Sequence, residues 1–322
     1  MATLECRHCA ATSAIDLKLG VNAPSTTKVS ALPAAEFLLV TWTAQETGAM
    51  ATVLGGGQYH FDSGTENNFT PLVLPDLPLP SDEKCHAHFF QTKVNGKKVV
   101  CLKSEFHPKI QTAGTTTFFE RMIGSGTNPK FQYAVTSGTS GGIWKSLDVG
   151  DVVVTNQARY GFTMPQEKQA LIFTGMNDPI GTNPPAGNAT WYDYVNKQVL
   201  AGDGCVNSGL ATPGGRNAGS GKPTIYYKSS GANLTDVVTN SRISDDEYGK
   251  IAQYRQIGAT LDENDAYVAE AFEAVGFKNW ASIRNISDLP SPTNNDAQYD
   301  TFCFCSSLSG AYALWAFVMG HA

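Results

Sequence analysis

The sequence predicts an α/β fold built on a mixed sheet. Short, continuous apolar runs recur along the chain at the length of a strand, as is typical of strands buried on both faces. Helix-patterned segments accompany them, and strands joined by crossover helices give a mixed α/β architecture. With 42% hydrophobic and 16% charged residues over 322 positions, the chain can bury a large core.

The elements follow in order. Residues 1–33 keep no sustained period and are rich in Ser, Thr, Ala and Pro, so we expect an N-terminal extension ahead of one domain over 34–322. The run FLLVTW at 37–42 predicts the first buried strand. Glycines at 55–57 and the proline-rich stretch at 71–80 predict loops. Further strands are expected at 99–102, 133–135, 152–154, 171–173 and 280–283.

The composition changes at 178–233, where Gly, Pro, Asn and Ser dominate, and we expect a loop-rich insertion there. Residues 264–275 predict a helix. The apolar segment 303–319 predicts another, which is interrupted by three serines and a glycine and falls short of a membrane span. This last helix either packs on its own sheet or forms a contact between subunits of a homo-oligomer.

Charge and cysteine content limit the function classes. The 23 basic and 29 acidic residues give a net charge of −6 without a basic run, which excludes nucleic acid as an expected partner. We expect no membrane association, no secretory signal, and a cytoplasmic protein whose seven cysteines are reduced. Cys6-Arg7-His8-Cys9 has the spacing of a zinc or redox pair, but no second pair completes it, which favours an ordinary terminal segment.

Three stretches carry candidate chemistry. The sequence VTSGTSGG at 135–142 predicts a loop whose glycines let backbone N–H groups approach a ligand, although a plain Gly/Ser turn explains it equally. Asp288 ends the strand SIRNISD, where open α/β sheets bind ligands, or it is a turn former. Glu46 follows the first strand, where an acid in the first turn of a helix also suits the dipole.

Together these stretches resemble the nucleoside phosphorylase superfamily, and most closely its methylthioadenosine/S-adenosylhomocysteine nucleosidase branch. SGTSGGIWKSLDVGDVVVTNQARY is similar to the family's G-S/T-x-G-G loop with its following L-x-V-G-D-I/V-V and A-R-Y motifs. SIRNISD is similar to its R-x-I-S-D strand end, and ENDA stands where the family has E-M-E-A. The resemblance covers about 36–46, 90–175 and 236–320, and it implies a three-layer fold.

The resemblance also implies roles. Asp288 matches the acid that protonates purine N7, which needs a raised pKa. Arg284 matches the arginine that orients the acid or the water, and Glu46 the carboxylate that positions the attacking water. Asp265 matches the acid that grips the ribose. Further substrate contacts are implied for Gly138, Thr139, Asn264, Tyr160 and Asn240. No cofactor and no catalytic metal is implied.

Water, rather than phosphate, is the expected nucleophile. Related phosphorylases carry an arginine three residues before the loop hydroxyl, where this chain has Thr136. A phosphate dianion in a dry site is costly without such a cation, and Glu46 would repel it. The expected function is therefore purine-nucleoside hydrolysis. A phosphorylase with cations from Arg121, Lys145 or a neighbouring subunit remains an alternative.

Departures from the family keep a third reading open, a nucleoside-binding member without catalysis. Asn264-Asp265 replaces the Met-Glu pair and shortens the sugar-binding carboxylate by one methylene. The base-binding strand at 238–243 lacks the aromatic residue that would stack on the purine. Stacking could come instead from Trp191, Tyr192, Tyr160 or Phe162.

Overall fold

The computed structural model describes residues 17–61, 68–80, 83–107, 112–124, 126, 129–182, 184–198, 200, 222–227, 237–239, 249–290 and 295–322. The strands are β1 (Phe37–Thr41), β2 (Thr70–Leu72), β3 (Ala87–Val94), β4 (Lys97–Ser104), β5 (Tyr133–Gly142), β6 (Val152–Thr155), β7 (Gln157–Tyr160), β8 (Ile172–Thr174), β9 (Ile225–Tyr226), β10 (Val237–Thr239), β11 (Thr260–Asp262) and β12 (Trp280–Asp288). The helices are α1 (Ala44–Leu54), α2 (Thr112–Ile123), α3 (Gln166–Gln169), α4 (Trp191–Gln198), α6 (Ile251–Tyr254), α7 (Asp265–Ala274) and α8 (Asn295–His321).

These strands form one mixed sheet. Its main path runs β2-β3-β4-β1-β5-β11-β10-β7-β8, while β12 branches from β5 to β6 and β9. At the centre β1 is parallel to β4 and β5, and β12 is parallel to β5. Parallel strands end at the same edge of a sheet, so β1, β4, β5 and β12 all run toward one edge.

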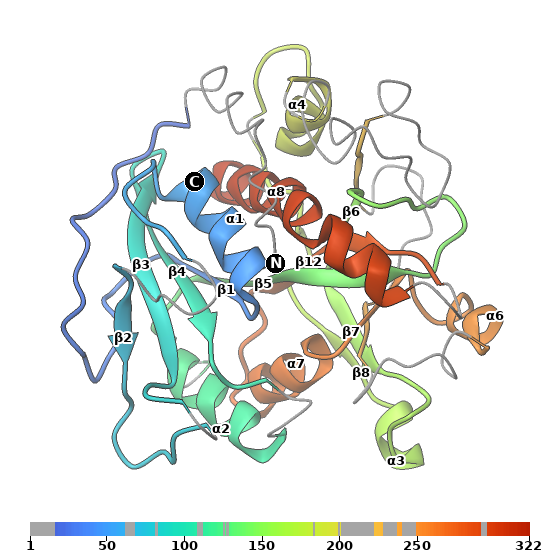
Figure 1. Cartoon of the computed structure of the whole chain (residues 1–322), viewed down its shortest axis with the longest axis horizontal. Coiled ribbons are helices and arrows are strands. Elements are labelled where there is room, and N and C mark those ends of the chain that lie inside the picture. The colour runs from blue at the N-terminus through green and yellow to red at the C-terminus, as the bar shows by residue number, and fades with distance from the viewer. Residues whose placement is uncertain are drawn as a thin grey trace.

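Helices cover both faces of the sheet and produce three layers (Figure 1). Helices α1 and α8 pack on one face, and α2 and α7 pack together on the other. Alternate residues of β1 enter the two resulting cores, with Phe37 and Leu39 on the α1/α8 side and Leu38 and Val40 on the α2/α7 side. A strand buried on both faces needs an unbroken apolar run, which explains FLLVT.

The long helix α8 belongs to the core. Its segment Asp296–His321 is long and apolar enough to cross a membrane, but 83% of the most apolar window is buried inside the protein. Trp315 is among the largest fully buried side chains, and Phe317 packs edge-on against Phe37 of β1. The helix therefore satisfies its apolar surface against the sheet and α1.

The structure changes one expectation about the stretch 138–142. These residues continue β5 as a regular strand instead of forming a loop. Gly138, Thr139 and Ser140 pair with residues of β12, and Gly142 pairs with Thr260 of β11. The glycines are needed for close approach of neighbouring side chains, as described below, and the backbone groups are satisfied by the sheet.

Parts of the expected extension and insertion also join the fold. Leu19 forms a bridge to Val94 of β3, and Val29 forms one to Leu72 of β2. Within 178–233, α4 packs against α8, and β9 adds a parallel strand to β6. The expectation of reduced thiols is wrong at Cys305, which is joined in a disulfide.

Candidate active site

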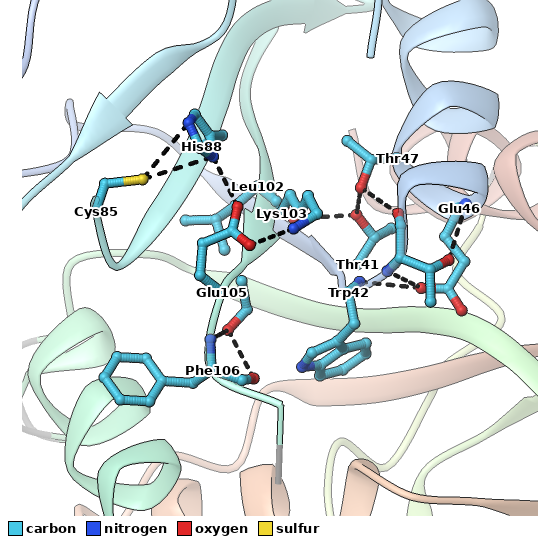
Figure 2. A network of polar contacts seen from close by, with 12 residues as sticks. Thr41, Trp42, Glu46, Thr47, Cys85, His88, Leu102, Lys103, Glu105 and Phe106 are labelled. Atoms are coloured by element: carbon cyan, nitrogen blue, oxygen red, sulfur yellow. Dashed lines mark hydrogen bonds and ion pairs between the residues drawn. The ribbon is translucent and has the colours of Figure 1, made fainter. Parts of the chain in front are cut away.

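The candidate site lies at the edge where β1, β5 and β12 end, and Glu46 stands at its centre. Thr43 caps α1, and Glu46 returns a capping-box bond: its Oε2 accepts from the backbone N–H groups of Thr43 (2.9 Å) and Trp42 (3.0 Å). Figure 2 shows Glu46 folded back toward this turn. The cap fixes the direction of the carboxylate as soon as the helix forms.

The second oxygen of Glu46 reaches across to β5. Oε1 accepts from the backbone N–H of Thr139 (2.7 Å) and from the Thr139 hydroxyl (2.8 Å). Glu46 therefore has four hydrogen-bond donors while only 5% of its surface is exposed. A carboxylate has enough acceptor sites to take all four, so its position is fixed from both sides.

Gly138 provides the space between Glu46 and Arg284. A Cβ at this position would lie 2.6 Å from Nη1 of Arg284 and 2.9 Å from Oε1 of Glu46. Both polar atoms thus face the same point beside the Gly138 backbone, and no larger residue fits there. The pairing of Gly138 with Arg284 in the β5–β12 register brings these groups together.

Arg284 is fully buried and surrounded by carboxylates. Its Nε donates to Oδ2 of Asp265 (2.7 Å), its Nη2 bonds Oδ1 of Asp265, and Nη2 also lies 2.9 Å from Oδ2 of Asp262. The guanidinium carbon sits 5.2 Å from the centre of the Trp42 ring. Burial alone would lower the pKa of Arg284, but Asp262 and Asp265 outweigh this effect and raise it.

One donor of Arg284 remains available. Nη1 is buried and finds no hydrogen-bond acceptor among the described residues. A buried charged donor without a partner is costly, and such a group normally marks a site for water or a ligand. Together with Glu46 it forms a donor–acceptor pair around the point next to Gly138.

Asp265 is held by its neighbours at the start of α7. Besides Arg284, the Ser282 hydroxyl of β12 donates to its Oδ2. Its own backbone N–H donates to Oδ2 of Asp262 (2.9 Å), as does that of Asn264 (3.1 Å). The residue expected to grip the ribose thus points both oxygens at Arg284. The side-chain oxygen of Asn264 is buried and has no partner among the described residues.

Asp288 lies further along the same strand as Arg284. It ends β12 opposite Gly141, after an irregular register at Ile286, and it is 5% exposed. The Ser287 hydroxyl donates to its Oδ1 (2.6 Å). Thr139, which holds Glu46, pairs with Asn285. Asp288 pairs with Gly141, so it lies two β5 residues beyond the level of Thr139.

The expected aromatic contacts lie in other surroundings. The Tyr160 hydroxyl donates to Glu270 (2.6 Å), and its ring packs on Phe173 and Tyr267 in the α7 core. Tyr192 is fully buried and donates to the Pro179 carbonyl, and Trp191 packs on Trp315. Asn240 lies outside the described residues.

Sequence reasoning missed four residues of the site. Asp262 and Ser282 hold the Arg284–Asp265 pair, Trp42 covers the guanidinium, and Tyr299 of α8 lies near Thr43, Thr139 and Glu46. Burial and the charge of Glu46 raise the pKa of Tyr299, which keeps its hydroxyl protonated. Asp262 stands two residues before Asn264, so its sequence position could have marked it as a neighbour of the predicted sugar-binding pair, whereas nothing in the sequence marks Tyr299.

Comparison with solved structures shows that this fold is the one used by nucleosidases. The putative 5′-methylthioadenosine/S-adenosylhomocysteine nucleosidase of Borrelia burgdorferi B31, bound to adenine, matches with a TM-score of 0.57 at 16% identity, over 88% of this chain and 99% of that one. The corresponding nucleosidase of Helicobacter pylori matches at 0.55 and 13%, over 92% and 99%. The futalosine hydrolase of H. pylori strain 26695 matches at 0.55 and 13%, over 89% and 98%.

Among curated sequences, the 5′-methylthioadenosine/S-adenosylhomocysteine nucleosidase of Haemophilus influenzae strain PittEE is 34% identical over 74 residues, and that of strain PittGG is 32% identical over the same length. The aligned part is 23% of this chain and spans 29% of each relative. No protein-family model matches the chain. The predicted resemblance and the α/β nucleoside phosphorylase-like fold are confirmed.

Proposed function

We propose that this protein is a purine-nucleoside N-ribosyl hydrolase, an N-glycosyl hydrolase of the EC 3.2.2 type. The observation that carries the proposal is the pair on either side of Gly138, formed by Glu46 Oε1 and by Arg284 Nη1, which lacks an acceptor within the described part of the chain. Water suits this pair because its oxygen can accept from Nη1, while one of its hydrogens takes the place of the Thr139 hydroxyl as a donor to Glu46 Oε1. The fold and the nucleosidase relatives support the same reading.

In the proposed mechanism, protonated Asp288 donates its proton to N7 of the purine as the bond between N9 and C1′ breaks. The sugar passes through an oxocarbenium-like state, which the water held by Glu46 and Arg284 attacks at C1′. The water gives its proton to Glu46, and free base and ribose leave.

The charges around Arg284 favour water over phosphate. Asp262, Asp265 and Glu46 together carry more negative charge than the single guanidinium neutralises. A phosphate dianion entering here would need further cations. Arg121, one candidate, donates instead to the backbone carbonyl of Pro75 (2.6 Å).

A second candidate, nucleoside binding without turnover, has one observation in its favour. Asp265 is committed to Arg284 and Ser282, so the sugar hydroxyls would need another partner. The side-chain oxygen of Asn264, which no described residue contacts by a hydrogen bond, can accept from a hydroxyl. We therefore propose Asn264, and not Asp265 alone, as the sugar contact.

The experiment incubates the protein with adenosine, inosine, guanosine or methylthioadenosine in phosphate-free buffer. The released base and sugar are then separated and measured by chromatography. Hydrolysis predicts free base and free sugar, at a rate that added phosphate leaves unchanged. Asp288→Asn and Glu46→Gln should each abolish release while the nucleoside still binds. Ribose 1-phosphate formed only with phosphate would establish the phosphorylase, and binding without any release would establish the binder. A homo-oligomer and a cytoplasmic location stay predictions.

A further inference from the structure

A second cluster of polar side chains lies at the open end of the β3–β4 hairpin, where β3 begins and β4 ends, outside the candidate active site. Cys85 precedes β3, His88 lies on β3, and Glu105 directly follows β4. The antiparallel register sets His88 opposite Lys103 and so brings Glu105 alongside the ring. One ligand atom from each of the three residues falls within 4.8 Å of the others (Figure 2).

The distances within this cluster match the needs of a tetrahedral metal. Sγ of Cys85 is 3.6 Å from Nδ1 and 3.5 Å from Nε2 of His88. In tetrahedral zinc sites, bonds of about 2.0–2.3 Å place neighbouring donors about 3.3–3.7 Å apart. The closest pair is Nδ1 of His88 and Oε1 of Glu105 at 2.7 Å, which would have to open by less than about 1 Å. The near-equal sulfur–nitrogen distances also argue against a linear thiol-to-imidazole bond.

The Glu105 carboxylate of the cluster is negatively charged and oriented toward His88, as a cation site requires. Burial would raise the pKa of Glu105, but the His88 hydrogen bond and the charge of Lys103 lower it overall, so the carboxylate is ionised. Lys103 bonds Oε2, which leaves Oε1 turned toward His88. Such an outer partner fixes the orientation of a ligating carboxylate. Cys85 and His88 are 2% and 4% exposed, which shields the site from competing ligands.

We propose that Cys85, His88 and Glu105 bind one zinc ion, which fastens the segment before β3 to the end of β4. Thiolate, imidazole and carboxylate are the donor set that zinc takes in proteins. On binding, the Cys85 thiol releases its proton to solvent, and the proton on Nδ1 of His88 moves to Nε2, so that each residue offers one lone pair. Water fills the fourth position. The site lies apart from the proposed chemistry at Glu46.

The test uses the full chain carrying C6S and C9S, which removes the other zinc-like spacing. After treatment with EDTA, the protein is dialysed against ZnCl₂ and its zinc content is measured by mass spectrometry. We expect one zinc per chain and a higher Tm with zinc than without it. Cys85→Ser and His88→Asn each remove a ligand and should weaken binding by more than the roughly 10–100-fold that the loss of an outer partner costs. The matched control is Cys101→Ala, because Cys101 is buried on the adjacent strand outside the cluster.

A spectroscopic readout protects the test against variants that merely misfold. Co²⁺ in place of zinc should give a thiolate-to-metal charge-transfer band, present in the control and absent in Cys85→Ser. Glu105→Gln, nearly the same shape as the native residue, should keep the circular dichroism of the parent and lose zinc affinity. Failure of the parent to bind zinc, or equal binding by the parent and the Cys85 and His88 variants, overturns the proposal. Neither result bears on nucleoside cleavage.

Discussion

Replacing Gly138 with alanine would put a methyl group between the two buried ions of the candidate site. The new carbon would lie 2.6 Å from Nη1 of Arg284 and 2.9 Å from Oε1 of Glu46, where ordinary contacts begin near 3.4 Å. Neither group can yield easily, because Glu46 is held by four donors and Arg284 by two carboxylates. We expect a loss of about 1–3 kcal/mol from the free energy of unfolding.

The same displacement, of the order of 0.5–1 Å at the water site, should lower kcat/KM for base release by about a hundredfold. The matched control is Gly114→Ala on α2, whose added methyl would lie 2.5 Å from Cε1 of Phe106 in the core on the α2/α7 side. Both variants should lose stability in urea, but only the first should lose most of its activity. A folded G138A protein with wild-type kcat/KM would refute the assignment of this point to the nucleophile.

The other predictions concern the ions around that point and the hairpin cluster. In Glu46→Gln the carbonyl oxygen can keep the two bonds from Trp42 and Thr43, which sets the amide N–H against the backbone donor of Thr139 and should cost about 3 kcal/mol of stability in urea unfolding. Thr139→Val should then cost less when combined with Glu46→Gln than alone, since both remove the bond from the Thr139 hydroxyl to Oε1. Asp265→Asn takes one of two carboxylates from the buried Arg284 and should cost about 3 kcal/mol. The folded-state pKa of Glu105 is lowered, so its ionised form stabilises the protein above the unfolded pKa of about 4.3, and this contribution is lost as the pH falls through the folded pKa. The Tm advantage of the wild type over Glu105→Gln should therefore shrink in acid.

Each of these has a clear contrary result. Additive losses for Glu46→Gln and Thr139→Val would mean that the two side chains do not interact in solution. An Asp265→Asn protein as stable as the wild type would mean that Arg284 is solvated and not buried. A Tm advantage of the wild type over Glu105→Gln that grows toward low pH would reverse the sign derived for Glu105.

The central strands were predictable because burial on both faces leaves an unbroken apolar run in the sequence, as in β1 and β6. Strand β3 was missed because its polar positions interrupt the run. Yet Asn95-Gly96, both with positive φ, is the usual signal of a two-residue hairpin between β3 and β4. The stretch 138–142 was read as a loop because its glycines mean close approach as often as a turn, and only the β12 register decides between the two.

Some residues of the candidate site could likewise be predicted from the sequence, and others could not. Glu46 was found because it follows the first strand and matches the family's glutamate; its capping box with Thr43, three residues before it, is a local signal on which that prediction did not rest. The bond between Arg284 and Asp265 joins residues 19 positions apart on different elements, and no spacing rule predicts it. Tyr299 reaches Thr139 from the far end of the chain, so its part in the site depends on how α8 packs.

Helix α8 is long and apolar enough to cross a membrane, but in the folded protein the sheet and α1 cover its apolar surface. Whenever the fold opens, this apolar segment is exposed to solvent and to any lipid present. Substitutions that weaken the packing around α8 would then redistribute the protein toward bilayers, and the amount recovered with vesicles would report on its folding.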